Sequence, residues 1–145
     1  MEHIVHNVED LRAVAVSLLE NLDDRKIIAF DGAMGAGKTT FVQMILKAMG
    51  VEEVQGSPTY SLVNEYESPM YGKIFHFDLY RLNSEEEAYD IGIEEMIYAD
   101  KFCFIEWPTH IAHLLPEDTV WIKIRLNDSL DRVITWDEQE ENHVL

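Results

Sequence analysis

The chain is predicted to contain three helices, the first of them from the spacing of its apolar residues. In the first, the apolar side chains share one helical face behind Asn7, a candidate N-cap. These side chains are Leu11, Val14, Leu18 and Leu22. A second helix is expected over residues 40–49, with Gly50 as its C-terminal stop. A third is expected to begin at Ser84, because Glu87 three residues later completes a capping-box pattern.

Short apolar and β-branched runs between these helices predict strands. They lie near residues 4–6, 26–30, 60–67, 73–78, 101–106, 119–126 and 132–136. The turn-forming segment Ser68–Gly72 separates two of these runs, 60–67 and 73–78, so we expect them to form a hairpin. Helices mixed with strands indicate an α/β fold, and the hairpin favours a mixed, mainly parallel sheet.

The composition fits one compact domain. The chain has 145 residues, of which 47% are hydrophobic, and it contains neither an internal repeat nor a linker rich in Pro, Gly or Ser. We expect a domain over residues 1–136 and an acidic, flexible tail over residues 137–145. A solvated chain end is the simpler interpretation of this tail, and docking to a partner is the alternative.

Cysteine use and the chain ends favour a cytoplasmic protein. Cys103 is the single cysteine and lies in an apolar run, where a small buried strand residue is expected and an internal disulfide is excluded. The first residues lack the basic and apolar regions of a signal peptide, and no segment has the length of a membrane span.

The segment from Gly32 to Thr39 carries the most specific chemical signal in the chain. It matches the phosphate-binding pattern G-x-x-x-x-G-K-[ST], between a predicted strand and a predicted helix. In this pattern backbone N–H groups surround phosphate oxygens, Lys38 reaches the β- and γ-phosphates, and the Thr39 hydroxyl ligates Mg²⁺. The residues expected at the nucleotide are Gly35, Ala36, Gly37, Lys38, Thr39 and Thr40. Together with the mixed helices and strands, this loop predicts a single three-layer P-loop NTPase domain.

A P-loop site needs a further acidic group near Mg²⁺, usually at the end of an apolar strand. Glu106 and Asp78 both end such runs. Glu106 fits better because its run is more continuously apolar, although either carboxylate could instead cap the following turn. No histidine has a partner at metal-ligand spacing, so no histidine site is proposed; His76 lies within a predicted strand.

Two further segments hold candidate residues with competing interpretations. Thr59 and Ser61 follow the P-loop helix, where switch loops of P-loop proteins approach Mg²⁺ and the γ-phosphate, but a plain Ser-Pro turn would explain the same residues. Trp107 follows Glu106 and either packs in the core or covers the site.

The charge of the chain limits its partners. Eleven basic residues against 28 acidic residues give a net charge of −17. Proteins that grip nucleic acid by its phosphates usually carry a basic face, so strong direct binding of RNA or DNA is not expected. The chain has no Asn/Thr-Lys-x-Asp element for guanine, which favours ATP over GTP.

Four segments together resemble the TsaE family, small ATPases of tRNA threonylcarbamoyladenosine synthesis. They are residues 35–40, 57–66, 76–82 and 105–108. The resemblance implies that Lys38 and Thr39 bind phosphate and Mg²⁺ and that Glu106 is the second protein ligand of the metal. It also implies that Asp78 is needed for hydrolysis and that Thr59 belongs to a switch-like loop.

The same resemblance extends to other positions and to partners. It implies that Trp107 lies close to the nucleotide and that Arg132 is a basic residue near it. It further implies a complex with two proteins of the TsaB and TsaD type, whose repeated threonylcarbamoyl transfer the ATP cycle supports.

Three functions therefore remain to be separated. The first is Mg-ATP hydrolysis that is slow alone and faster with partner proteins. The second is a small-molecule P-loop kinase, although such enzymes usually carry an arginine-rich lid and the basic residues here are scattered. The third is a nucleotide-gated binding protein without meaningful hydrolysis.

Overall fold

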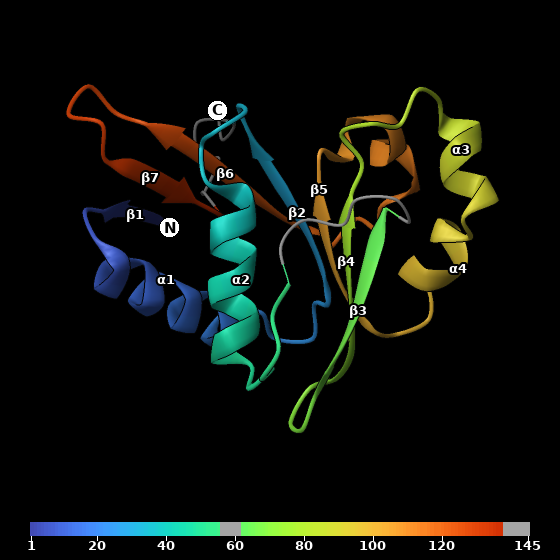
Figure 1. Ribbon diagram of the computed structural model, residues 1–145, viewed down its shortest axis with the longest axis horizontal. Coiled ribbons are helices and arrows are strands. Elements are labelled where there is room, and N and C mark those ends of the chain that lie inside the picture. Colours follow the sequence, from blue (N-terminus) through green and yellow to red (C-terminus); the bar gives the residue numbers. More distant parts are fainter. Residues whose placement is uncertain (56–61, 138–145) are drawn as a thin grey trace, which may run out of the picture.

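The computed structural model describes residues 1–55 and 62–137, which form a seven-stranded mixed sheet with helices on both faces (Figure 1). The elements in chain order are β1 (Glu2–Val5), α1 (Val8–Glu20), β2 (Ile27–Gly32), α2 (Lys38–Ala48), β3 (Val63–Ser68), β4 (Gly72–Asp78), α3 (Glu85–Asp90), α4 (Ile93–Ile97), β5 (Phe102–Glu106), the 3₁₀ helix η1 (Pro108–Leu114), β6 (Val120–Leu126) and β7 (Arg132–Thr135).

The sheet has the order β1-β7-β6-β2-β5-β4-β3. Its four central strands, from β6 to β4, are parallel, while β3 at one edge and β7 with β1 at the other pair antiparallel. The predicted hairpin is β3–β4, in which Ser68 pairs with Gly72 across the turn. The predictions of an α/β fold and a mixed sheet with a hairpin are thus confirmed.

Two buried apolar clusters, one on each face of the sheet, make the three layers. Because successive strand residues point to opposite faces, Ile28 of β2 packs toward α1 and α2, whereas Ile27 packs toward α3, α4 and η1. The four apolar side chains predicted to share one face of the first helix are all buried in the first cluster. Cys103 is fully buried in the second, where burial raises the pKa of its thiol to about 12 and keeps it protonated.

Helix ends follow the predictions in two cases and depart from them in a third. The Asn7 side chain accepts a hydrogen bond from the Asp10 N–H, as an N-cap does, and Gly50 follows α2 with a φ of 89°. Ser84 precedes α3, but its side chain makes no capping bond, so the predicted capping box is wrong. The Glu87 carboxylate instead accepts a hydrogen bond from the Asn83 N–H at 3.1 Å. This bond satisfies the backbone donor of the residue that precedes Ser84.

The topology brings the candidate residues to one edge of the sheet. The parallel strands β2, β4 and β5 end side by side, and Glu106 of β5 pairs in register with Phe30 of β2 and Asp78 of β4. The loop after β2 leads directly into α2 at this edge. Among residues 1–55 and 62–137, no helix combines the length and apolar character needed to traverse a bilayer.

Candidate nucleotide-binding site

The loop between β2 and α2 has the backbone that a phosphate-binding loop requires. Gly35 and Gly37 have φ values of 82° and 105°, which glycine adopts without the strain that a side chain would add. Gly37 is the N-cap of α2, and Lys38 and Thr39 are its first two residues. The N–H groups at this helix start therefore face the same region as the two functional side chains, an arrangement that favours an anion.

Lys38 is buried against its own loop and an aromatic ring. Its ammonium donates to the carbonyl oxygens of Gly32 and Ala33 and lies 3.8 Å from the centre of the Trp107 ring. Burial lowers the pKa of Lys38, and the neighbouring carboxylates, chiefly that of Glu106, oppose this shift. The structure thus holds the cation at the mouth of the loop through carbonyl and cation–π contacts.

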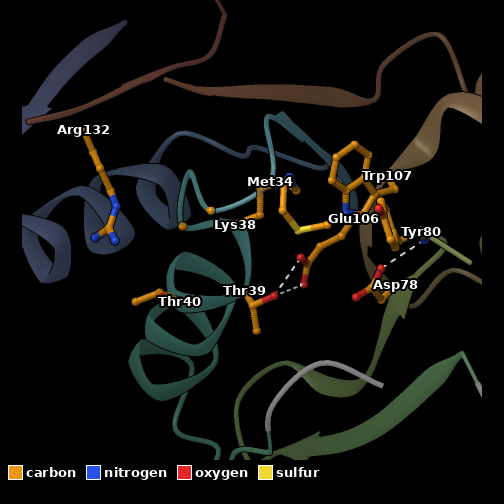
Figure 2. A pocket seen from close by; sticks show the side chains of 11 residues that line it. Met34, Lys38, Thr39, Thr40, Asp78, Tyr80, Glu106, Trp107 and Arg132 are labelled. Atoms are coloured by element: carbon orange, nitrogen blue, oxygen red, sulfur yellow. Dashed lines mark hydrogen bonds between the residues drawn. The ribbon is translucent and has the colours of Figure 1, made fainter. Parts of the chain in front are cut away.

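Thr39 and Glu106 meet beneath the loop (Figure 2). The Thr39 hydroxyl lies 2.8 and 3.0 Å from the two carboxylate oxygens of Glu106, which is only 2% exposed. A hydroxyl that donates its hydrogen to a carboxylate keeps oxygen lone pairs that can ligate a cation. Of the two acidic candidates from the sequence, Glu106 is the one that contacts Thr39.

Asp78 lies beyond Glu106, on the side away from Thr39 (Figure 2). Its carboxylate accepts a hydrogen bond from the Tyr80 N–H at 3.1 Å, so it closes the turn after β4 while also lining the cavity beside the loop. The capping and the functional interpretations of Asp78 are therefore compatible.

Trp107 covers one side of the site. Its backbone adopts the left-handed conformation, with a φ of 57°, which turns the chain sharply after Glu106. The indole contacts Lys38 on one side and lies 4.9 Å, centre to centre, from the Tyr80 ring. It is half-buried, so packing and covering of the site are both served by one side chain.

Arg132, at the start of β7, reaches the loop from the opposite side (Figure 2). Its Nε donates to the Ala36 carbonyl oxygen at 3.1 Å. A Cβ added to Gly37 would lie 2.6 Å from the same nitrogen, which shows how closely the guanidinium approaches the loop. Arg132 therefore supports the loop backbone from a strand far away in the sequence.

Two adjoining cavities flank this arginine. The first, of about 330 Å³, is lined by Met34, Gly35, Gly37, Lys38, Thr39, Thr40, Asp78, Tyr80, Glu106, Trp107 and Arg132. The second, of about 340 Å³, is lined by Val5, His6, Asn7, Val8, Leu11, Thr40, Met44, Leu126, Leu130, Asp131 and Arg132. Thr40 and Arg132 line both, so a ligand longer than a phosphate group could extend from one to the other.

His76 contacts this site through Glu106, although it was not among the candidate residues predicted from the sequence. It is fully buried, and its Nε2 lies 2.6 Å from Glu106 Oε2. The signal was its position two residues before Asp78, because alternate strand residues face the same side of a sheet. Thr59 and Ser61 lie outside the described residues.

The chemistry of the donors suits a magnesium ion that a nucleotide brings with it. The Thr39 hydroxyl and Glu106 carboxylate supply hard oxygen atoms, which Mg²⁺ prefers. The described part of the chain holds no group of three or more His, Cys, Asp or Glu side chains that could bind a metal alone. Mg²⁺ commonly takes its remaining ligands from phosphates and water, so this sparse set fits a metal that is bound together with phosphate.

Comparisons with known proteins agree on one family. A family model described as "Threonylcarbamoyl adenosine biosynthesis protein TsaE" matches residues 5–134. The chain is 38% identical over 114 residues to the tRNA threonylcarbamoyladenosine biosynthesis protein TsaE of Treponema pallidum, covering 79% of this chain and 83% of that protein. It is 34% identical over 131 residues to the protein of the same name from Rickettsia bellii, covering 90% of each.

A solved structure extends the likeness to the fold. The crystal structure of YdiB from Bacillus subtilis matches with a TM-score of 0.71 and 23% sequence identity, over 94% of this chain and 83% of that one.

Proposed function

The chain belongs to the TsaE family of threonylcarbamoyl adenosine biosynthesis proteins, and from this premise we propose that it binds Mg-ATP and hydrolyses it to support repeated turnover of a tRNA-modifying complex. The observation that carries the proposal is the contact of the Thr39 hydroxyl with the buried Glu106 carboxylate beneath a glycine loop. A loop that only begins a helix would not need a carboxylate held at this position.

Four side chains that line the cavity, those of Lys38, Thr39, Asp78 and Glu106, have roles in this proposal. Lys38 and the loop amides offset charge on the β- and γ-phosphates, while Thr39 and Glu106 hold Mg²⁺. When bound, Mg²⁺ neutralises charge on the phosphate oxygens. Asp78, which lines the same cavity, and Thr59 are the candidates for orienting the attacking water.

The second cavity is the proposed place of the nucleobase and ribose. It begins at Thr40 and Arg132, where the phosphate cavity ends, and Val8, Met44 and Leu130 contribute apolar surface to it. A planar, weakly polar base suits such a lining better than it suits the charged phosphate cavity. Replacing Met44 with Glu is expected to weaken ATP binding at least tenfold while leaving pyrophosphate binding unchanged.

The proposed partners are two proteins of the TsaB and TsaD type. The net charge of −17 argues that this chain acts on proteins rather than gripping tRNA itself. Lys38 and Arg132 are the basic side chains among the described residues that line the phosphate cavity, and Arg132 is engaged by the Ala36 carbonyl. We therefore expect slow hydrolysis alone and faster hydrolysis with the partner pair.

Two measurements test the proposal. Depletion of the protein should lower threonylcarbamoyladenosine in cellular tRNA, as measured by nucleoside analysis, and an unchanged level would refute the assignment. Purified protein should hydrolyse ATP at least tenfold faster with the partner pair than alone, with Lys38→Ala as the inactive control. Equal rates with and without partners would refute the stimulation.

The two alternatives make different predictions. A small-molecule kinase would transfer phosphate to a metabolite, which a screen of a metabolite pool would detect, but a cavity with two basic side chains gives this reading less support. A nucleotide-gated binding protein would still support the modification as Glu106→Ala, provided that this variant binds ATP.

A further inference from the structure

Glu106 has a second contact that the nucleotide site does not itself require. The imidazole of His76 lies on β4, and its Nε2 is 2.6 Å from Glu106 Oε2. Both side chains are buried, with exposures of 0% and 2%. The carboxylate is therefore held from two sides, by His76 from the neighbouring strand and by Thr39 from the first turn of α2.

The donor and acceptor roles in this contact follow from the chemistry of the partner. An ionised carboxylate can only accept hydrogen bonds, so the contact with an ionised Glu106 requires the hydrogen to be on His76 Nε2. The other ring nitrogen, Nδ1, is buried and has no hydrogen-bond partner in the part of the chain that the structure describes. The imidazole thus directs its polar contact toward Glu106, at the expense of one unsatisfied ring nitrogen.

The shape of the contact restricts how Glu106 can turn. The terminal torsion of a glutamate side chain is broad. The Thr39 hydroxyl lies within reach of both carboxylate oxygens, so a hydrogen bond from Thr39 alone would allow the carboxylate plane to rotate. A bond to Oε2 from the neighbouring strand fixes which oxygen faces β4, and Oε1 is then the oxygen nearer to Thr39, at 2.8 Å. A packing role alone would be served better by an apolar side chain, because burial of an incompletely paired imidazole costs free energy.

We propose that His76 is a positioning residue that orients the Glu106 carboxylate for the Mg²⁺ of the bound nucleotide. The inference rests on the proposed Mg-nucleotide function. Groups that hydrogen-bond to a metal ligand fix its orientation, and their loss typically lowers metal affinity 10- to 100-fold. His76 is fully buried and does not line the phosphate cavity, so its effect is expected on magnesium-dependent binding alone.

The test compares two polar variants that differ in reach. Gln places an amide nitrogen near the position of His Nε2, whereas Asn is one methylene shorter and ends near Nδ1. The affinity of the full chain for a fluorescent ADP analogue is titrated in excess Mg²⁺ and in EDTA, and the ratio of the two dissociation constants is the magnesium gain. His76→Gln should keep the gain within about threefold of the unmodified chain, and His76→Asn should lower it about tenfold or more.

Controls separate this inference from the function on which it rests. Affinity in EDTA should be the same for all variants, and His3→Asn, a half-buried histidine that stacks on Trp136 away from the site, should keep the full gain. In a Glu106→Gln background, His76→Asn should have no further effect on the gain. If the unmodified chain shows no gain, the proposed function fails.

The outcomes for the inference are equally distinct. Equal magnesium gains for His76→Gln and His76→Asn, at any level, would overturn the positioning role of His76. It would also be overturned if the affinity of His76→Asn fell as much in EDTA as it did in Mg²⁺. Thermal unfolding monitored by circular dichroism establishes that each variant is folded. If His76→Asn does not fold, His76→Leu replaces it under the same criterion, because Leu has similar bulk and no donor.

Discussion

The ammonium of Lys38 lies 3.8 Å from the centre of the Trp107 ring. Lys38 is at the same time bonded to the carbonyl oxygens of Gly32 and Ala33, so its cation is fully engaged within the protein. A phosphate group that binds in the loop competes with these contacts, because the ammonium has only three hydrogens to donate. Nucleotide binding should therefore move the Lys38 charge relative to the indole.

This movement predicts a change in tryptophan fluorescence on nucleotide binding. A cation beside an indole alters its emission, and Trp107 is the tryptophan that lines the phosphate cavity. The response should disappear in Trp107→Phe and persist in Trp121→Phe, whose side chain lies on β6 and does not line the cavity. A titration with ADP measures this change in fluorescence. A response that persists in Trp107→Phe would contradict the proposed movement of the Lys38 ammonium away from the indole.

Two variants of Thr39 test whether its hydroxyl contributes to Mg-ADP binding. Thr39→Ser keeps the oxygen that contacts Glu106, so its affinity for Mg-ADP should remain within about threefold of the unmodified chain. Thr39→Val keeps the shape but removes the oxygen, and it should lose roughly tenfold or more, since hydrogen bonds to charged groups contribute about 1.5–3 kcal/mol. Calorimetric titration would measure both, and equal affinities would contradict a ligand role for this hydroxyl.

Two glycines of the loop, Gly35 and Gly37, provide a matched pair of substitutions. Gly35 and Gly37 both have positive φ, so alanine at either position should cost about 1–2 kcal/mol of strain. A Cβ at Gly35 meets nothing within 4 Å, whereas one at Gly37 meets Arg132 Nε at 2.6 Å. Gly37→Ala would displace the Arg132 guanidinium from the Ala36 carbonyl, so it should destabilise the protein by about 1 kcal/mol more than Gly35→Ala in urea unfolding.

The source of that extra cost can be tested directly. In an Arg132→Ala background the penalty of Gly37→Ala should fall to about that of Gly35→Ala, because the crowding atoms are gone. An unchanged penalty would mean that the backbone conformation alone explains it.

The sequence was sufficient to predict structural features that depend on neighbouring residues. The P-loop pattern, the Asn7 cap and the Ser68–Gly72 turn each depend on a few neighbouring residues, and the structure has all three. The proximity of Glu106 and Asp78 was also accessible, because parallel strands that end at one sheet edge bring their last residues together.

Other features depend on contacts that no local pattern encodes. His76 reaches Glu106 from the neighbouring strand, 30 residues away in the sequence, and Arg132 reaches Ala36 from 96 residues away. The helix α4 has five residues and η1 seven, too few for a helical period to be recognised. Thr59 stays a prediction, because it lies outside the described residues.

The last described residue, Asp137, predicts a pH dependence of stability. Arg25 donates to both Asp137 oxygens, at 2.8 and 2.7 Å, and this bond lowers the pKa of Asp137 below its ordinary value of 3.8. A carboxyl group with a lowered pKa in the folded state contributes stability above its unfolded pKa, and this contribution disappears as the pH falls through the folded pKa. The contribution should be at most about 1 kcal/mol, because the pair is partly exposed.

Asp137→Asn should accordingly lower the free energy of unfolding at pH 7 but leave it unchanged at a pH below the folded pKa of Asp137. Urea unfolding across this range measures the difference between the two curves. Glu9→Gln is the matched control, because Glu9 pairs with Arg12 three residues away on an exposed helix face. Its curve should follow that of the unmodified chain, since such a pair adds only a few tenths of a kcal/mol. A gap between the Asp137→Asn curve and the unmodified curve that stays constant down to the lowest pH would show that the carboxyl charge is not what Arg25 stabilises.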